Sequence, residues 1–458
     1  MNMNTLSELL SAMAAGETSS ESLIDEALAR IALPTGEGAR AFTRVYRESA
    51  VQQARVVDGK RRAGATLGPL AGLPISVKDL FDIEGETTHA GSIVLKGSMA
   101  AKHDAEIVRR LRAADAVIIG RTNMTEFAFS GIGINPHYGT PKNPWDRATG
   151  RIPGGSSSGA AVSVTDRMAA AAIGTDTGGS VRIPAALCGI TGFKPTAKRI
   201  PKDGCLPLST TLDSIGPLAR SVACCARVDA VLSGESMRGE PVRELAPPPL
   251  RGLRIGVVRD LVGEGMDEQV ARSMDGALSA LSALGVWVQE MPFPELLELP
   301  QVNRFGGFST YEAWHWHRDL LARGAQHYDP RVAVRLKKGA DFSDAAYEEL
   351  KRERARIIAA STQRFAGFDA LVWAVSPVVA PPIAALVADD DVFTRFNALI
   401  LRNPAAVNFL DGCALSLPCH AEGDAPVGLM LVGRAGEDRR ILDIGAAIEE
   451  GLSGTRIR

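Results

Sequence analysis

The chain has 458 residues, enough for one large α/β domain or for two to three domains of ordinary size. Its 51 basic and 53 acidic residues leave a formal net charge of −2. Because the charges are spread along the chain, they give no electrostatic footprint for nucleic acid or for an anionic membrane, and a small neutral substrate fits this balance better than a polyanion.

The cysteine pattern and the N-terminus indicate a reducing compartment. The six cysteines show no C-x-x-C pairing and no accompanying histidine pattern, so neither a zinc site nor a disulfide framework is predicted. The first residues, MNMNTLSELLSAMAAGETS, lack the basic start and apolar run of a signal peptide. The longest apolar run, residues 370–388, contains three prolines that a spanning helix would tolerate poorly. We therefore expect a soluble, cytoplasmic protein.

The N-terminal third begins with helices and continues into a sheet. Apolar residues at three-to-four spacing predict helices over 5–15 and 20–31, which would form a helical layer over residues 1–62. Residues 69–79 then alternate as a strand that leads to Lys78. A lysine in this place commonly extends its ammonium into water. The alternative is a buried, neutral amine that acts as a base, which requires its pKa to fall by about 3 units.

The remaining elements alternate between helices and strands, as in a sheet with helices packed on it. Neither internal repeats nor a low-complexity linker interrupts them, so one domain is favoured over several. Helices are predicted over 105–114, 267–284, 345–356 and 439–452, and strands over 116–120, 253–258, 286–290, 369–377 and 427–433. The segments CGITGFKPT, LDSIGPLARS and FLDGCALSLP continue the pattern without an assigned type. Residues 308–356 carry no strand signal and are predicted to form a helical excursion over the sheet.

Two glycine- and serine-rich clusters, GGSSSG at 154–159 and TGGS at 177–180, stand out between these elements. Glycine lets the backbone turn sharply and aim its N–H groups at a ligand. Neither cluster has the G-K-[ST] of a phosphate-binding P-loop or the G-x-G-x-x-G of a dinucleotide site. Ser157 is central in a G-x-S-x-G pattern with His420 downstream, but no buried strand precedes it, as a hydrolase nucleophile elbow requires. A serine nucleophile activated by a lysine through another hydroxyl remains as the third interpretation.

The combined motifs settle this choice by resemblance. GLPISVKDLFD, GGSSSGAAV and GTDTGGSVRIPAALCGITGFKPT resemble the amidase signature family of Ser-cisSer-Lys hydrolases, most strongly over residues 67–218, the expected catalytic core. The resemblance continues more weakly to the C-terminus, so that residues 1–458 would be one amidase signature domain. It implies an α/β fold with a central mixed sheet covered by helices on both faces, and chemistry without a metal or organic cofactor.

The resemblance also implies a role for each residue of the two clusters. Lys78 would be the general base, Ser156 the bridging serine behind a cis Gly155–Ser156 peptide bond, and Ser180 the nucleophile. The N–H groups of Thr177, Gly178, Gly179 and Ser180 would form the oxyanion hole. Supporting roles would fall to Ser157, Ser158, Asp176 and Arg182. One departure is GGSSSGA in place of the family's common GGSSGG, which keeps every catalytic side chain.

The substrate is less well specified by the sequence. Aromatic and apolar residues before the serine clusters, together with a tyrosine in the helical excursion at 300–360, are candidate pocket residues: Phe127, Phe129, Ile132, Tyr138 and Tyr311. We expect an amidase that hydrolyses a small to medium carboxamide to a carboxylate plus ammonia or an amine. The alternatives are the glutaminase (A) subunit of a tRNA-dependent amidotransferase, which would need partner subunits, and a hydrolase of urea derivatives such as biuret or allophanate. A homodimer is a reasonable expectation.

Overall fold

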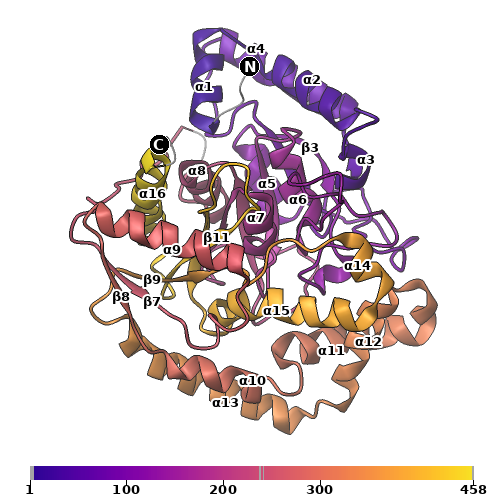
Figure 1. Cartoon of the computed structure of the whole chain (residues 1–458). Helices are drawn as coiled ribbons and strands as arrows, with labels where there is room; N and C mark the ends of the chain where they lie inside the picture. The colour runs from indigo at the N-terminus through magenta and orange to yellow at the C-terminus, as the bar shows by residue number, and fades with distance from the viewer. Residues whose placement is uncertain (1–4, 237–238, 241, 456–458) are drawn as a thin grey trace.

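Apolar residues run without alternation along the central strands, because helices cover both faces of the sheet. The computed structural model describes residues 5–236, 239–240 and 242–455, and the sheet in this part of the chain has 11 strands (Figure 1). The strands are β1 (Phe42–Val45), β2 (Pro74–Lys78), β3 (Val117–Thr122), β4 (Ala171–Asp176), β5 (Thr191–Lys194), β6 (Ser214–Ala219), β7 (Arg254–Val257), β8 (Trp287–Glu290), β9 (Ala370–Ala374), β10 (Cys413–Pro418) and β11 (Gly428–Gly433).

The strand order is β1-β3-β2-β4-β6-β5-β10-β11-β9-β7-β8, and the sheet is mixed. Strand β2 runs parallel to both β3 and β4, and β7 runs parallel to β8 and β9. The other pairs are antiparallel. Because β2 and β4 are parallel neighbours, the last residues of both strands, Lys78 and Asp176, lie at the same edge of the sheet.

The helices are α1 (Leu6–Ala15), α2 (Ser20–Ile31), α3 (Gly38–Ala41), α4 (Arg47–Arg62), α5 (Glu106–Ala113), α6 (Ser158–Thr165), α7 (Arg182–Cys188), α8 (Val222–Ser233), α9 (Glu268–Ala283), α10 (Leu299–Val302), α11 (Gly307–Gly324), α12 (Pro330–Lys337), α13 (Asp344–Ser361), α14 (Ile383–Ala388), α15 (Asp390–Phe409) and α16 (Asp438–Thr455). No helix in the described ranges is long and apolar enough to span a bilayer.

Successive residues of one strand enter different cores, which shows that both faces of the sheet are buried. In β3, Ile118 packs in a core with residues of α5 and α8, whereas Val117 and Ile119 pack in another with residues of α2 and α6. Strand β4 divides its side chains in the same way. The predicted fold class, a single α/β domain with a central mixed sheet flanked by helices, is confirmed.

Strands β1 and β4 were not predicted, and β5, β6 and β10 lie in segments to which the sequence pattern assigned no type. Strand β1 lies inside the segment expected to be helical and pairs antiparallel with β3 at the edge of the sheet. Strand β4 was hidden by its composition, AAIGTD, because alanine and glycine are weak strand formers. Small residues are needed there: a Cβ on Gly174 would lie 2.6 Å from the Oγ of Ser157.

Residues 300–360 contain helices and short turns but no strand among them, in agreement with the pattern. In Figure 1, α10, α11, α12 and α13 lie together below the sheet, and α15 runs between them and the rest of the molecule. Helix α15 was not predicted, although it spans 20 residues. Its two ends differ in environment, because it passes from solvent at Asp390 into the core at Phe409.

Candidate active site

Lys78 ends the fully buried strand β2 with its side chain inside the protein rather than in water. The side chain is 0% exposed. Its Nζ donates hydrogen bonds to the Oγ of Ser156 at 2.7 Å and to the Oγ1 of Thr175 at 2.8 Å. Burial lowers the pKa of Lys78 to about 7, and the more distant Cys205, Asp213 and Asp176 offset this only in part. A large fraction of the amine is therefore uncharged at neutral pH.

Ser156 lies in a tight loop before α6, and its position depends on the glycine that precedes it. The peptide bond between Gly155 and Ser156 is cis, as the resemblance predicted. A Cβ on Gly155 would lie 2.6 Å from the backbone N of Gly133, so only glycine fits here. The carbonyl of Ser156 accepts a hydrogen bond from the Thr125 N–H at 3.0 Å, which fixes this loop against its neighbour.

The next two serines contact the backbone of neighbouring segments. The Ser157 N–H donates to the carbonyl of Ser180 at 3.3 Å, so the two glycine- and serine-rich clusters meet at this point. The Ser157 Oγ donates to the carbonyl of Thr175, and the Ser158 Oγ donates to the carbonyl of Asn123, both at 3.5 Å. All of these side chains are buried.

The turn 177–180 connects β4 to α7 and is held by a buried ion pair. Asp176 and Arg182 are both 0% exposed, and their side chains meet at 2.9 Å. Arg182 also donates to the carbonyl of Pro404 and to the Oδ1 of Asn408, both in α15. Asn408 in turn donates to the Asp176 carboxylate at 2.9 Å. Burial alone would raise the pKa of Asp176, but Arg182 and these hydrogen bonds hold it well below its usual range.

The expected oxyanion donors fall into two groups. Among the described residues, the N–H groups of Gly178 and Ser180 have no hydrogen-bond acceptor, and both residues line a cavity together with Thr177. The N–H of Gly179 instead donates to the Asp176 carboxylate at 2.8 Å. Gly179 is therefore a correction to the predicted set, because its N–H is engaged in shaping the turn.

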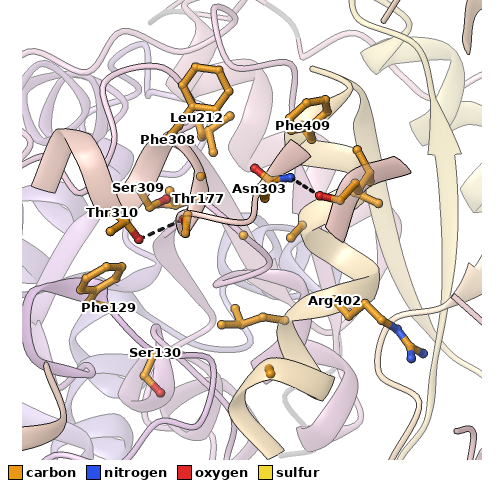
Figure 2. A pocket seen from close by; sticks show the side chains of 18 of the residues that line it. Phe129, Ser130, Thr177, Leu212, Asn303, Phe308, Ser309, Thr310, Arg402 and Phe409 are labelled. Carbon is orange, nitrogen blue, oxygen red and sulfur yellow. Dashed lines mark hydrogen bonds between the residues drawn. The ribbon is translucent and has the colours of Figure 1, made fainter. Parts of the chain in front are cut away.

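The cavity beside this turn has a volume of about 870 Å³ and a largely apolar wall. Figure 2 shows side chains from distant segments around it, with Phe129, Ser130 and Thr177 facing Phe308, Ser309 and Phe409. Its wall comes from the loop 128–130, the turn 177–180, the loop 208–212, helices α10 and α11 with the segment between them, α12, and α15. A volume of this size is typical of a small-molecule site.

Of the five candidate pocket residues, only Phe129 is among the described residues that line this cavity. Phe127 packs edge-on against His317 with ring centroids 4.4 Å apart, and Ile132 is buried in the core. The Tyr138 hydroxyl donates to the carbonyl of Ser92 at 3.4 Å. Tyr311 stacks on Tyr347 and lines a different, smaller hollow. These four positions are corrections, because neighbours far away in sequence determine where each ring is buried.

The nucleophile-elbow alternative finds no support in the geometry. His420 lines a separate surface hollow with Gly189 and Arg220, and its Nδ1 accepts a hydrogen bond from the Val427 N–H. The site instead contains residues that sequence reasoning missed, namely Thr175, Asn408 and Asp213. Asp213 accepts a hydrogen bond from the Thr177 hydroxyl at 2.5 Å. Thr175 directly precedes Asp176, an expected supporting residue, and this adjacency was the signal that could have found Thr175.

The described residues contain no group of three or more histidine, cysteine, aspartate or glutamate side chains that could hold a metal ion. The chemistry of the donor set around Lys78 is that of hydroxyls and backbone amides. Such a set suits proton transfer and the binding of a developing negative charge.

Comparison with known proteins points in the same direction. The family model described as Amidase matches residues 22–442. The chain belongs to the amidase family. A relative in this family, 2-amino-5-chloromuconic acid deaminase of Comamonas testosteroni, is 35% identical over 423 residues, covering 91% of this chain and 88% of the relative.

Other amidase-family relatives carry different names. The A subunit of the glutamyl-tRNA(Gln) amidotransferase from Symbiobacterium thermophilum is 34% identical over 467 residues, covering 95% of this chain and 94% of the relative. A crystal structure of an amidase superposes with a TM-score of 0.86 at 31% identity, covering 97% of this chain and 99% of the other. The protein is thus an amidase-family enzyme, a hydrolase acting on amide C–N bonds.

Proposed function

We propose that this enzyme hydrolyses a small to medium carboxamide to a carboxylate plus ammonia or an amine, through an acyl-enzyme on Ser180. The observation that carries the proposal is the buried Lys78 amine hydrogen-bonded to Ser156, with Ser180 in the wall of the adjoining cavity. A neutral amine in this place can accept the proton that a serine hydroxyl loses when its oxygen attacks a carbonyl carbon.

In the acylation step, the Oγ of Ser180 attacks the amide carbonyl carbon. Its proton passes to the Oγ of Ser156 while the Ser156 proton passes to the Nζ of Lys78. The carbonyl oxygen becomes an oxyanion that accepts hydrogen bonds from the N–H groups of Thr177, Gly178 and Ser180. When the C–N bond breaks, the proton returns by the same route to the leaving nitrogen, which departs as ammonia or an amine.

In the second step, water takes the place of the Ser180 hydroxyl. It attacks the ester carbon and gives its proton to the Ser156–Lys78 relay. The carbon–oxygen bond to Ser180 breaks, and the relay returns the proton to the Ser180 oxygen. The product leaves as the carboxylic acid, which loses its proton to water and becomes the carboxylate, and the enzyme is restored with a neutral lysine.

Single substitutions test this proposal. Ser180→Ala, Ser156→Ala and Lys78→Ala should each lower kcat/KM on a panel of aliphatic, aryl and urea-type amides by several orders of magnitude, measured as ammonia or amine release. Ser163→Ala is the matched control, because Ser163 is also a buried serine but bonds Ser76 in the core. A fluorophosphonate should add its mass to Ser180 in the wild type. Full activity in Ser180→Ala would end the proposal.

The second candidate is the glutaminase subunit of a tRNA-dependent amidotransferase, which the relative from Symbiobacterium thermophilum favours by its name and by its coverage of 95% of this chain. Glutamine hydrolysis should then depend on added partner subunits. An assay of the chain alone and with those subunits, with its mass in solution measured in parallel, separates this function from an independent amidase. The same mass measurement tests the predicted homodimer.

A further inference from the structure

The wall of the active-site cavity carries an imbalance of charge. Among the described residues that line it there are three arginines, Arg335, Arg395 and Arg402, and neither an aspartate nor a glutamate. The rest of the wall is apolar or uncharged. The near-neutral charge of the whole chain gives no hint of this local excess of positive charge.

Two of the three guanidinium groups are accounted for by their surroundings. Arg402 donates to the carbonyls of Val262 and Glu264 and to the Oδ1 of Asn403. Figure 2 shows its guanidinium extending away from the labelled side chains of the cavity. Arg395 is exposed, so water solvates its charge.

Arg335 is different, because it is partly buried and has no acidic partner. It lies in the last turn of α12, and its Nη1 donates to the carbonyl of Phe129. Its Cζ lies 4.4 Å from the centre of the Phe129 ring. Among the described residues, no aspartate or glutamate lies within ion-pair distance of it. Burial lowers the pKa of Arg335 to about 10, which leaves the group charged at neutral pH.

A guanidinium has five N–H donors in a planar fork that matches a carboxylate. One carbonyl acceptor uses only part of this capacity. A charge held in an apolar wall without a counter-ion is unfavourable until an anion neutralises it. Arg335 therefore has N–H donors left for an anion, and no carboxylate among the described residues pairs with its charge.

We propose that Arg335 binds a carboxylate of the substrate, so that the preferred substrates are monoamides of dicarboxylic acids rather than neutral amides. This inference rests on the proposed function, because the amide end would lie at Ser180 and the carboxylate at the Arg335 side of the same cavity. Free glutamine fits less well, since no acidic side chain among the described lining residues pairs with its ammonium group.

Binding and turnover test the proposal separately. Succinamate, glutaramate and adipamate are each compared with the alkanamide of the same chain length, and glutaramate also with glutamine. Dissociation constants are measured by calorimetry on the Ser180→Ala protein, which does not require turnover. On the wild type, kcat/KM is measured for every pair. We expect the best carboxylate of the series to be favoured about 10- to 100-fold over its alkanamide, as for a hydrogen-bonded charge.

Arg335→Leu should reduce this preference to near unity, and Arg335→Lys should keep part of it. The matched control is Arg331→Leu, one turn earlier on α12, where the arginine already pairs with Asp390 at 2.7 Å. That variant should retain the preference. Equal binding of every carboxylate and its alkanamide to Ser180→Ala would overturn the inference, and so would a preference that survives Arg335→Leu. Absence of hydrolysis of every amide would contradict the proposed function instead, while the dissociation constants would still decide the role of Arg335.

Discussion

A lysine that lies beside two hydroxyls, without a carboxylate, loses the stabilisation that keeps an ammonium charged. Lys78 is in this situation, since its Nζ donates hydrogen bonds to Ser156 and Thr175 and to no other side chain among the described residues. Its burial supplies the lowered pKa that a base needs at neutral pH. Because Lys78 is buried at the end of an apolar strand and does not extend into water, its position indicates a role as a base.

The pH dependence follows directly. Because only the neutral amine accepts a proton, kcat/KM should rise about tenfold per pH unit at low pH and level off above about 7, the pKa of Lys78. Thr175→Val removes an acceptor that favours the charged amine, so its inflection should lie at lower pH than that of the wild type. Initial rates over pH 5–9 measure both. A pH-independent rate across this range would contradict the assigned base.

Asp176 and Arg182 form a fully buried pair whose separation should be costly. Asp176→Asn leaves the Arg182 charge uncompensated and should lower the free energy of unfolding by about 3–5 kcal/mol in urea at pH 7. Because the pKa of Asp176 is depressed in the folded state, this stability is fully present at pH 7 and is lost only as the pH falls below the ordinary range of an aspartate. Glu298→Gln, in an exposed pair with Arg356, should cost less than about 1 kcal/mol. Similar losses in the two variants would be inconsistent with this account.

At the scale of elements, the site is a turn between a strand and a helix that a second helix braces. Strand β4 ends at Asp176, α7 begins at Arg182, and α15 contacts both through Pro404 and Asn408. Gly179 has a φ of 122° in this turn, and a Cβ there would lie 2.5 Å from the Cγ of Pro404. The turn can thus approach α15 closely only because residue 179 is glycine.

Two neighbouring glycines make this testable. Gly179→Ala should lower the free energy of unfolding by about 1–3 kcal/mol, because it combines backbone strain with the clash against Pro404. A Cβ on Gly178 would meet its nearest atom at 3.7 Å, an ordinary contact, so Gly178→Ala should keep nearly the wild-type stability. Urea unfolding of both variants measures the difference. Equal stabilities would show that the turn is not constrained in this way.

At the scale of the whole molecule, the cavity lies between the core with the two clusters and the helices of residues 300–360. Glu312 of α11 joins these two parts. It accepts hydrogen bonds at 2.5 Å from the hydroxyls of Ser209 and Thr211 in the core, and from the Tyr347 hydroxyl in α13. The loop that it holds carries Leu208 and Leu212 of the cavity wall.

Glu312→Gln should therefore affect substrate binding as well as stability. The amide nitrogen cannot accept these hydrogen bonds, so we expect a loss of about 1.5–3 kcal/mol and a raised KM with a smaller change in kcat. Glu349→Gln, in an exposed pair on α13, is the control and should change neither quantity. Urea unfolding and steady-state kinetics provide the measurements. An unchanged KM in Glu312→Gln would show that the loop is held by other contacts.

The two glycine- and serine-rich clusters and the fold class could be predicted from the sequence. The glycines and serines at 154–159 and 177–180 indicated two tight turns that could form a site, and the resemblance to the amidase signature family assigned Lys78, Ser156 and Ser180 their expected roles. The alternation of helical and strand patterns indicated a sheet with helices packed on it, and the resemblance implied a mixed sheet covered on both faces. Strands β1 and β4 were not predicted, because a short edge segment and an alanine-rich run carry little intrinsic strand signal.

The tertiary structure alone decided the rest. Phe127 and Phe129 are two residues apart, yet only Phe129 lines the cavity, because packing against His317 buries the other ring. Arg335 and Asn408 reach the site from segments more than 150 residues beyond Ser180. The cavity wall is made where such distant segments pack together, and neither spacing nor local propensity encodes which side chains will face each other there.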